Sequence, residues 1–367
     1  MFTKYVLTGG STMAEIMGLG MFHGPHPGLT DETMANVYFK RVLQDPRTPA
    51  DVLDRANWPQ GLIEEWGADE GVAAARRHRE VAIDACLQAR KAVDEFNPDI
   101  VVIFADDQYE NFKEDVLPPF CVYAADEFDL ADLAKGAPKV SSGLAPEPLP
   151  HPPLQPTVRG SKAIGTYLAN ALVRNDFDVA CAWKLHHMDH LGHAFSHSVD
   201  YLDWERKGFP YPIIPFHVSC YGTNLKVPSL GPITPGRLQD DVDIPPPDSP
   251  TPKRCYDIGR EVAQILEASP YRSLIIGSAS WSHASLTPMH GYLWGDVESD
   301  RVHLEELRSG QFAKWRDMSA EQMQVSGQHE MRNWVALAGA LEGRDVEVLG
   351  YAETYVFNSS KCVALFR

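Results

Sequence analysis

The chain has 367 residues, of which 44% are hydrophobic and 23% are charged, and this ordinary globular composition excludes the disordered, collagenous and coiled-coil classes. Fifty acidic residues stand against 33 basic ones, so the formal net charge is −17. A charge of this sign repels phosphate backbones and anionic membrane surfaces, so we expect neither nucleic acid nor a membrane as a partner.

Cysteine usage and hydropathy indicate a cytoplasmic protein. No CxxC pair is present, and the cysteines are too scattered for a disulfide framework, which fits a reducing compartment. The six are Cys86, Cys121, Cys181, Cys220, Cys255 and Cys362. The sequence has no run of about 18 apolar residues that could span a membrane, and its start lacks the basic segment and long apolar run of an export signal.

The first predicted element is a strand that opens at Met13 with the sequence Met-Ala-Glu-Ile-Met-Gly-Leu-Gly. The preceding residues show no clear periodicity, and we interpret residues 1–12 as a possible N-terminal extension. We expect residues 13–367 to form a single domain, because the pattern of helices and strands continues through the chain without a change of composition.

Helical and strand patterns alternate along the rest of the chain. A long helix with one apolar stripe is predicted from about Gly71, and a second helix starts at Thr251 and Pro252. Three short β-branched runs are predicted to be central strands buried on both faces: Ile100 to Ala105, Tyr211 to Val218 and Ser273 to Ala279. The alternation predicts an α/β fold with a central mixed, largely parallel sheet flanked by helices.

Two proline-dense stretches, 138–156 and 245–252, interrupt this pattern and are predicted to be long loops over the surface. The tail of the chain is predicted to form helices and then two short strands. Ser319 and Gln322 are a possible capping box there, and an apolar stripe from Met331 to Leu341 predicts a buried helix.

Polar residues directly follow two of the predicted central strands. The first of these strands leads into Asp106, Asp107 and Gln108, and the third leads into a segment that ends at His283. In open α/β sheets the crevice beyond the carboxyl ends of the strands collects functional groups. Solvated loop starts give the same pattern, so either segment alone leaves a purely structural interpretation open.

Histidines are concentrated in one segment, far beyond what an even spread along the chain would give. Five of the fourteen lie within twelve residues: His186, His187, His190, His193 and His197. Imidazole is the commonest metal ligand and the usual general acid or base near neutral pH, so the cluster indicates one or both roles. Several of the five can instead hydrogen-bond within a polar loop. His23, at the end of the predicted first strand, is a further candidate ligand.

The run from Asn97 to Cys121, with Asp-Asp-Gln-Tyr-Glu-Asn-Phe inside it, resembles the signature of class III extradiol ring-cleavage dioxygenases. These are the relatives of the protocatechuate 4,5-dioxygenase β-subunit and of 2,3-dihydroxyphenylpropionate dioxygenase. Further similar motifs follow the expected order: Gly20 to Pro25, Gly192 to Phe195, Tyr211 to Val218, Gly277 to His283, and Glu298 to Arg301. The Asp-Asp-Gln form resembles the methylgallate dioxygenases.

The resemblance implies Fe(2+) held by two histidines and one carboxylate, a facial triad that leaves positions open for substrate and O2. His23 matches the first histidine of the family, and Glu298 matches the carboxylate. The second histidine falls at Gln108, whose neutral amide oxygen is a poorer ligand. Either Gln108 binds the iron through that oxygen, or a histidine takes the place, the candidates being His26, His186 and His187.

The resemblance also implies two acid/base histidines, at His193 and His283. Ring opening needs one group that takes a phenolic proton and one that supplies a proton when the O–O bond breaks, and either histidine fits either role. Asp107 and His217 are expected to contact the substrate. The implied reaction inserts O2 into a catechol- or gallate-type ring, or a hydroxypyridone, next to its chelating oxygens.

Two features of the sequence point to other functions. Ser282 beside His283 suggests a serine hydrolase, but no Gly-x-Ser-x-Gly elbow is present, and adjacent strand residues point to opposite faces. Gln108 stands where the family has its second histidine. The alternative function is therefore a metal-binding protein of the same fold without ring-cleaving activity. For the enzyme we expect a small aromatic substrate and O2 as partners, and a homo-oligomer as the assembly.

Overall fold

The computed structural model describes residues 14–46, 48–113, 115–131, 144–152, 154–221 and 247–367. Residues 1–12, interpreted above as an extension, lie outside the described residues, as do parts of both proline-dense stretches. Within the described ranges, none of the helices is both long and apolar enough to cross a membrane.

Four parallel strands form the centre of an eight-stranded sheet, in the order β7, β2, β8, β1. They are β1 (Ile16–Met21), β2 (Ile100–Ala105), β7 (Ile213–Val218) and β8 (Ser273–Ser278), and every residue in them is buried. The three predicted central strands are therefore confirmed. Because the four strands are parallel, their carboxyl ends meet at one edge of the sheet.

The sheet changes direction on both sides of this centre. Strand β10 (Lys361–Phe366) pairs antiparallel with β1, and β9 (Val346–Ala352) pairs antiparallel with β10. On the other side, β3 (Phe120–Tyr123) pairs antiparallel with β7, and β6 (Ala180–Ala182) pairs parallel with β3. The sheet is thus mixed and mostly parallel, as predicted. A separate pair consists of β4 (Glu127–Asp129) and β5 (Thr157–Arg159).

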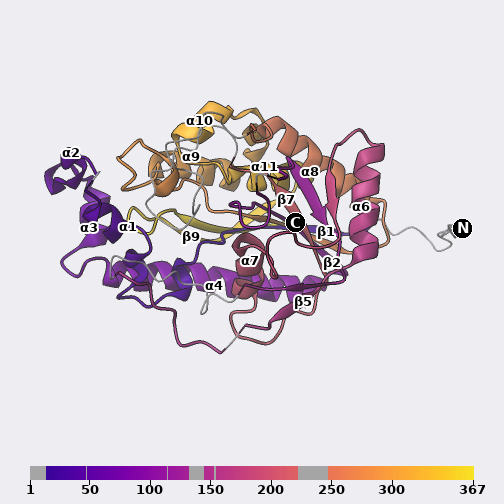
Figure 1. The fold of residues 1–367 in the computed structure, drawn as a ribbon, viewed down its shortest axis with the longest axis horizontal. Helices are drawn as coiled ribbons and strands as arrows, with labels where there is room; N and C mark the ends of the chain where they lie inside the picture. The colour runs from indigo at the N-terminus through magenta and orange to yellow at the C-terminus, as the bar shows by residue number, and fades with distance from the viewer. Residues whose placement is uncertain (1–13, 47, 114, 132–143, 153, 222–246) are drawn as a thin grey trace, which may run out of the picture.

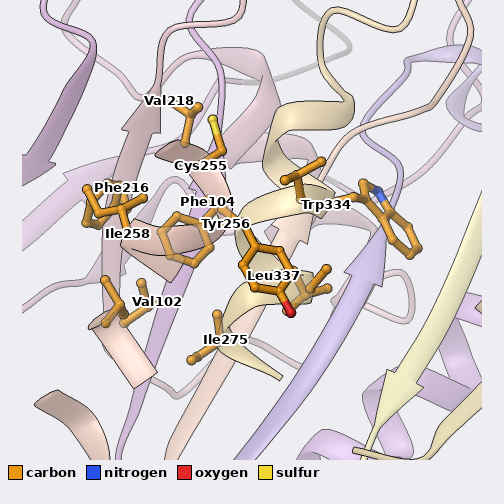
Figure 2. Close-up of a cluster of buried hydrophobic side chains, with 14 of the residues drawn as sticks. Val102, Phe104, Phe216, Val218, Cys255, Tyr256, Ile258, Ile275, Trp334 and Leu337 are labelled. Carbon is orange, nitrogen blue, oxygen red and sulfur yellow. The ribbon is translucent and has the colours of Figure 1, made fainter. Parts of the chain in front are cut away.

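Helices cover both faces of the sheet, which makes three layers (Figure 1). The long helix α4 (Val72–Phe96) and α7 (His193–Leu202) pack on one face. The other face is covered by α6 (Lys162–Arg174), α8 (Pro252–Glu267) and α11 (Met331–Ala340). Figure 2 shows part of the core on this face, which includes Ile258 of α8, Leu337 of α11 and Phe216 of β7.

Helices α8 and α11 approach each other closely because glycines lie where they cross. A Cβ added at Gly259 would stand 1.8 Å from the carbonyl oxygen of Ala336, and one added at Gly339 would stand 2.0 Å from that of Tyr256. Larger residues at either position would force the helices apart. The close packing holds the N-terminus of α11 against the carboxyl ends of the central strands.

Local signals in the sequence account for the helix ends. The Thr251 side chain accepts from the backbone N–H of Arg254 at the start of α8, and Pro252 is its first residue. Ser319 and Gln322 form the predicted capping box. The remaining helices are α1 (Phe39–Gln44), α2 (Ala50–Leu53), α3 (Gln60–Trp66), α9 (Val297–Arg308) and α10 (Ala320–Val325), with short 3₁₀ turns at His26–Gly28, Met34–Asn36, Arg55–Asn57, Ala284–Leu286 and Phe312–Asp317.

Candidate metal centre

A group of three buried side chains lies at the carboxyl ends of the central strands. His23 follows β1, Asp106 follows β2, and Glu330 is the N-cap residue of α11. One ligand atom from each lies within 4.8 Å of the others, and all three residues are buried. Within the described residues, this is the one group of three or more histidine, cysteine or acidic side chains with metal-binding spacing. We refer to it as the acidic centre.

The ring of His23 is oriented for binding a metal through Nε2. Its Nδ1 lies 3.1 Å from the carbonyl oxygen of Ser278 and 3.0 Å from the Oγ of the same residue. A carbonyl oxygen can only accept, so Nδ1 carries the hydrogen and Nε2 carries the lone pair. Nε2 lies 3.1 Å from Glu330 Oε2 and 3.8 Å from Asp106 Oδ1. The imidazole lone pair therefore points into the acidic centre.

Two carboxyl groups in a dry interior oppose each other's ionisation. Burial and the neighbouring charge of Glu330 raise the pKa of Asp106 to about 7, against the attraction of His23 and His193. For Glu330 burial also acts upward, but the attraction of His283 and His23 outweighs it and holds its pKa well below the usual range. A bound cation would allow both carboxylates to be charged at neutral pH.

The three residues of the acidic centre have buried side-chain atoms that are free to bind a divalent metal ion. Among the described residues, His23 Nε2, Asp106 Oδ2 and Glu330 Oε2 are buried side-chain atoms without a hydrogen-bond partner. Buried polar atoms normally have partners, so three converging orphans indicate a missing ligand. One imidazole and two carboxylates are a donor set that ferrous iron and similar transition metals accept.

Gln108 lies beside the acidic centre. Its Nε2 donates to Glu330 Oε1 at 2.9 Å and is 2.8 Å from the hydroxyl of Tyr221, which also bonds Glu330 Oε1. In this arrangement the amide fixes the orientation of the Glu330 carboxylate. Since the oxygen and nitrogen of an amide are assigned from their hydrogen bonds, a rotated Gln108 would present its oxygen to the same place. Its role as an iron ligand stays a prediction.

The structure does not bring Glu298, the predicted carboxylate ligand, into the acidic centre. Glu298 lies in the first turn of α9, where its side chain is 78% exposed and pairs with Arg301 at 2.5 Å. Glu330 supplies a buried carboxylate instead. Glu298 and Glu330 both lie at helix starts, but of the two only Glu330 lies with His23 and Asp106.

The three histidines considered as replacements for the second ligand also lie outside the acidic centre. His187 Nδ1 is bonded to the carbonyl oxygen of Asn111 at 2.7 Å, and the backbone N–H of His186 donates to the Asn111 side chain at 2.6 Å. These two histidines hold their loop, as expected for several members of the histidine-rich segment. His26 is buried in a different group, with His78 and Lys361 around it. The residue that lies with His23 and Glu330 in the acidic centre is Asp106.

His193, a predicted acid/base residue, reaches the acidic centre from the start of α7. Its ring stands edge-on to that of His23, with the centroids 5.2 Å apart. Its Nδ1 lies 2.9 Å from Glu110 Oε2, and its backbone N–H also donates to that carboxylate at 3.2 Å. Burial lowers the pKa of His193, but the charge and hydrogen bond of Glu110 prevail and raise it to about 9. Glu110 thus fixes the ring and favours its charged form.

His283, the other predicted acid/base residue, lies beside Glu330. Its Nε2 is 3.3 Å from Glu330 Oε2, and its Nδ1 is 3.0 Å from the carbonyl oxygen of Trp281. The carbonyl holds the hydrogen on Nδ1, which leaves the Nε2 lone pair directed at the centre. Burial lowers the pKa of His283, although Glu330 opposes this shift. Both predicted histidines are therefore beside the acidic centre.

The two predicted substrate contacts are placed differently. Both oxygens of Asp107 accept backbone N–H groups of Glu110, Asn111 and Phe112, at 2.6 to 3.3 Å. Asp107 therefore shapes the turn that presents Glu110 and does not offer a free oxygen to a substrate. His217, at the end of β7, packs against the ring of Phe112 at 4.8 Å, and burial lowers its pKa to about 3. Substrate contact by His217 stays a prediction.

Sequence reasoning missed Glu330 and the partner role of Glu110, and it noted Asp106 only as a polar strand end. One signal for Glu330 was available. The sequence Gln-His-Glu stands directly before the apolar stripe of α11, so three polar residues precede a helix that is almost fully buried. A polar helix start on a buried helix has to face a site or a partner.

Comparisons with known proteins agree with this geometry. Residues 247–362 match the family model of the catalytic LigB subunit of aromatic ring-opening dioxygenase, and this stretch contains His283 and Glu330. The class III extradiol dioxygenase resemblance drawn from the motifs is supported at this level. The closer resemblance to methylgallate dioxygenases stays a prediction.

Several curated relatives are named 2,3-dihydroxyphenylpropionate/2,3-dihydroxicinnamic acid 1,2-dioxygenase. The protein from Comamonas testosteroni is 28% identical over 250 residues, covering 68% of this chain and 62% of the relative. The protein from Photorhabdus laumondii is 25% identical over 216 residues, covering 59% and 52%. The protein from Cupriavidus necator is 27% identical over 296 residues, covering 69% and 79%. The chain thus spans less than two thirds of the length of the first two relatives.

Proposed function

We propose that this chain is a non-haem Fe(2+)-dependent extradiol dioxygenase, which inserts O2 to cleave a catechol- or gallate-type ring, or a hydroxypyridone, next to its chelating oxygens. The observation that carries the proposal is the acidic centre at the strand ends, with His193 and His283 beside it. The family match over residues 247–362 and the named relatives support the same reaction class.

His23, Asp106 and Glu330 would hold the iron. Gln108 bonds Glu330 through its amide nitrogen, and it would add its amide oxygen to the ligands only after rotation of the side-chain amide. When bound, the iron would act as a Lewis acid toward the chelating diol and bring substrate and O2 together. Around it, Ser278 fixes the tautomer of His23, and Tyr221 and Gln108 fix the carboxylate of Glu330. Such partners set the orientation and basicity of metal ligands.

The two flanking histidines divide the proton transfers according to their partners. His283 presents a lone pair at Nε2 because its Nδ1–H is bonded to the Trp281 carbonyl, so it is suited to take the phenolic proton. His193 has a carboxylate at Nδ1, which stabilises a charged ring, so it is suited to hold a proton and supply it to the developing oxygen anion. Glu110 acts through His193 by holding that ring in place.

One observation favours the alternative of a metal-binding protein without ring cleavage. The acidic centre contains a single imidazole, whereas the family resemblance implies two. A second carboxylate in place of a histidine makes the site more negative and more strongly attracted to hard cations. Metal bound without turnover would then be the outcome.

A reconstitution experiment separates the two functions. The protein is loaded anaerobically with Fe(2+) and a reductant, and O2 uptake is measured on catechols, gallates and hydroxypyridones. Activity that is lost on chelation and restored by Fe(2+) is the expected result. Stoichiometric iron without O2 uptake on any of these compounds would favour the metal-binding alternative, and full activity in metal-free protein would end the dioxygenase proposal. An aromatic substrate and O2 as partners, a homo-oligomer and a cytoplasmic location belong to the same proposal.

A further inference from the structure

Asn333 of α11 is a fully buried residue that links the three members of the acidic centre. Its backbone N–H donates to the carbonyl oxygen of Glu330 at 2.9 Å, and its side-chain Nδ2 donates to Asp106 Oδ1 at 3.1 Å. Nδ2 also donates at 3.1 Å to the carbonyl oxygen of Ser278, which accepts the Nδ1–H of His23 as well. One asparagine therefore connects proposed ligands that come from three different elements.

Two glycines allow α11 to lie close enough to the strands for these bonds. A Cβ added at Gly277 of β8 would stand 2.9 Å from the carbonyl oxygen of Asn333. One added at Gly20 of β1 would stand 2.3 Å from the ring of Trp334. Larger residues at either position would move the helix away from the strand ends, so the local sequence of both strands favours the position of Asn333.

The orientation of the Asn333 amide follows from its two partners. The carbonyl oxygen of Ser278 can only accept, so it must face the NH2 group, and a rotated amide would place its oxygen against this carbonyl and the carboxylate of Asp106. Both hydrogens of Nδ2 are thus used. Asn333 Oδ1 is buried without a hydrogen-bond partner among the described residues. A buried oxygen in this state is unfavourable, which indicates that the placement of the two donors is what matters at this residue.

Each carboxylate of the acidic centre has one oxygen bonded to the surrounding fold. Asp106 Oδ1 accepts from Asn333, and Glu330 Oε1 is bonded to Tyr221 and Gln108. In the part of the chain that the structure describes, the other oxygens, Asp106 Oδ2 and Glu330 Oε2, have no hydrogen-bond partner. With one oxygen held, neither carboxylate is free to turn both of its oxygens toward a cation.

Holding one oxygen of each carboxylate affects which cations the acidic centre accepts. Ca(2+) takes about six to eight oxygen ligands and readily binds a carboxylate through both oxygens. Ferrous iron and similar transition metals accept a smaller set that combines an imidazole nitrogen with single carboxylate oxygens. Asp106 Oδ1 lies 3.8 Å from His23 Nε2, so it borders the centre and would be within reach of a cation if Asn333 did not hold it.

We propose that Asn333 is a positioning residue for metal selection: by holding Asp106 Oδ1 it limits Asp106 to binding through one oxygen, and it thereby makes the acidic centre selective for transition metals over Ca(2+). The inference rests on the proposed function and deepens it, because two buried carboxylates with free rotation would attract hard cations. Asn333 acts through Asp106 and is not itself a ligand, since its NH2 group faces the carboxylate.

Metal titrations of the metal-free protein test this role without turnover. Dissociation constants for Co(2+), which stands in for Fe(2+), and for Ca(2+) are measured by calorimetry. We expect the wild type to bind Co(2+) at least about 100-fold more tightly than Ca(2+). Asn333→Leu, which is similar in size but has no donors, should weaken Co(2+) binding by about 10–100-fold and leave Ca(2+) binding unchanged or tighter. The preference for Co(2+) should therefore fall by at least about tenfold.

Two controls separate positioning from a general loosening of the helix. Trp334→Phe removes the indole N–H bond to the carbonyl oxygen of Ala279, which ties the same helix to the strand ends and in which none of the three proposed ligands takes part. It should leave the preference for Co(2+) unchanged even where it lowers the Tm. Asn175→Leu removes an exposed asparagine that donates to the Glu261 carboxylate, and it should change neither dissociation constant.

A double variant shows whether Asn333 acts through Asp106. In an Asp106→Asn background, Asn333→Leu should cause no further change in the cation preference. A further change as large as that in the wild type would overturn the proposal. An equal loss of affinity for both cations in Asn333→Leu, as a purely structural role predicts, would overturn it as well, and so would a wild type without preference. If Asn333→Leu does not fold, Asn333→Ala also removes both donors and should lower the preference by a similar factor, and an unchanged preference in that variant would overturn the proposal.

Failure of this role is distinguishable from failure of the proposed function. A preference that falls in Asn333→Leu, in a protein without O2 uptake on any substrate when loaded with Fe(2+), would keep the selection role and reject the dioxygenase. O2 uptake by the wild type, together with an unchanged preference in Asn333→Leu, would keep the dioxygenase and reject the selection role.

Discussion

The starts of helices α9 and α11 each carry a glutamate, and the two glutamates have opposite environments. Glu298 is solvent-exposed and pairs with Arg301 on its own helix, whereas Glu330 is fully buried and faces His23 and His283. The difference comes from packing. Asn333 and Trp334, one turn into α11, bond the backbone carbonyls of Ser278 and Ala279 at 3.1 Å and 2.8 Å, which ties this helix start to the strand ends.

The packing of its helix determines whether a glutamate at a helix start is buried in a site. The charged residues next to it in the sequence do not determine this burial. An exposed pair such as Glu298 with Arg301 is weak, because water solvates both groups and the long side chains lose freedom. A buried carboxylate must be matched by cations or hydrogen bonds, since otherwise it would not be ionised there. The charge of Glu330 therefore depends on its buried partners, whereas water solvates the charge of Glu298.

The largest effect should separate these two glutamates directly. Glu330→Gln removes a charged ligand from the acidic centre and should reduce iron retention by more than about 100-fold, with activity falling below detection. Glu298→Gln, the matched control, should leave both unchanged. Iron content after desalting and O2 uptake are the measurements. Equal iron content and equal O2 uptake in the two variants would contradict a ligand role of Glu330.

The flanking histidines should affect turnover while the metal stays bound. His193→Ala and His283→Ala should each reduce turnover by about 10²–10⁴-fold at nearly unchanged iron content, because they move protons and do not bind the metal. Single-turnover O2 uptake at known iron occupancy measures this. Loss of iron in His283→Ala would instead identify His283 as a ligand and give the acidic centre its second imidazole.

A smaller effect on iron affinity should distinguish Asp106 from Gln108 as the second ligand. Asp106→Asn should weaken iron binding by roughly 10–100-fold, and Gln108→Ala by about tenfold or less, if Asp106 binds the metal and Gln108 orients Glu330. Iron affinity by competition with a chelator ranks the two variants. The reverse ranking would assign the ligand role to Gln108, and tighter iron retention in Gln108→His would agree with that assignment, since imidazole is the better ligand.

The smallest effect should come from Glu110, which acts through His193. Glu110→Gln keeps a hydrogen-bond acceptor for His193 but removes the charge, and it should lower kcat by about tenfold while KM and iron content stay close to the wild type. Glu127→Gln is a suitable control, because Glu127 is an exposed strand residue. A kcat equal to that of the wild type would show that only the ring position matters.

The fold was predictable because its signals are local. The runs at β2, β7 and β8 are short and β-branched, and Thr251 and Ser319 mark their helix starts by side-chain caps. Pairing of the strands is not a local property. The antiparallel insertion of β10 beside β1, which places Lys361 next to His23, could not be read from either strand alone.

The site was predictable only in part, for the same reason. His23, His193 and His283 follow strands or open a helix within motifs that resemble a family, and the structure places all three at one edge of the sheet. Glu330 was missed because its burial depends on how α11 packs against α8 and the sheet, a contact between segments far apart in sequence. The hydrogen bonds of Asp107 to its own turn could not be read from residue type and position either.

The pairing of β1 with the late strands β8 and β10 has a consequence for biosynthesis. His23 emerges early from the ribosome, but Glu330 follows it more than 300 residues later. At about 5–20 residues per second, the nascent chain spends roughly 15–60 s with its first strand made and its proper neighbours still missing. For most of that interval β1 lacks its neighbour β8, and His23 lacks Glu330 until α11 is made, so the acidic centre can form only after synthesis of α11.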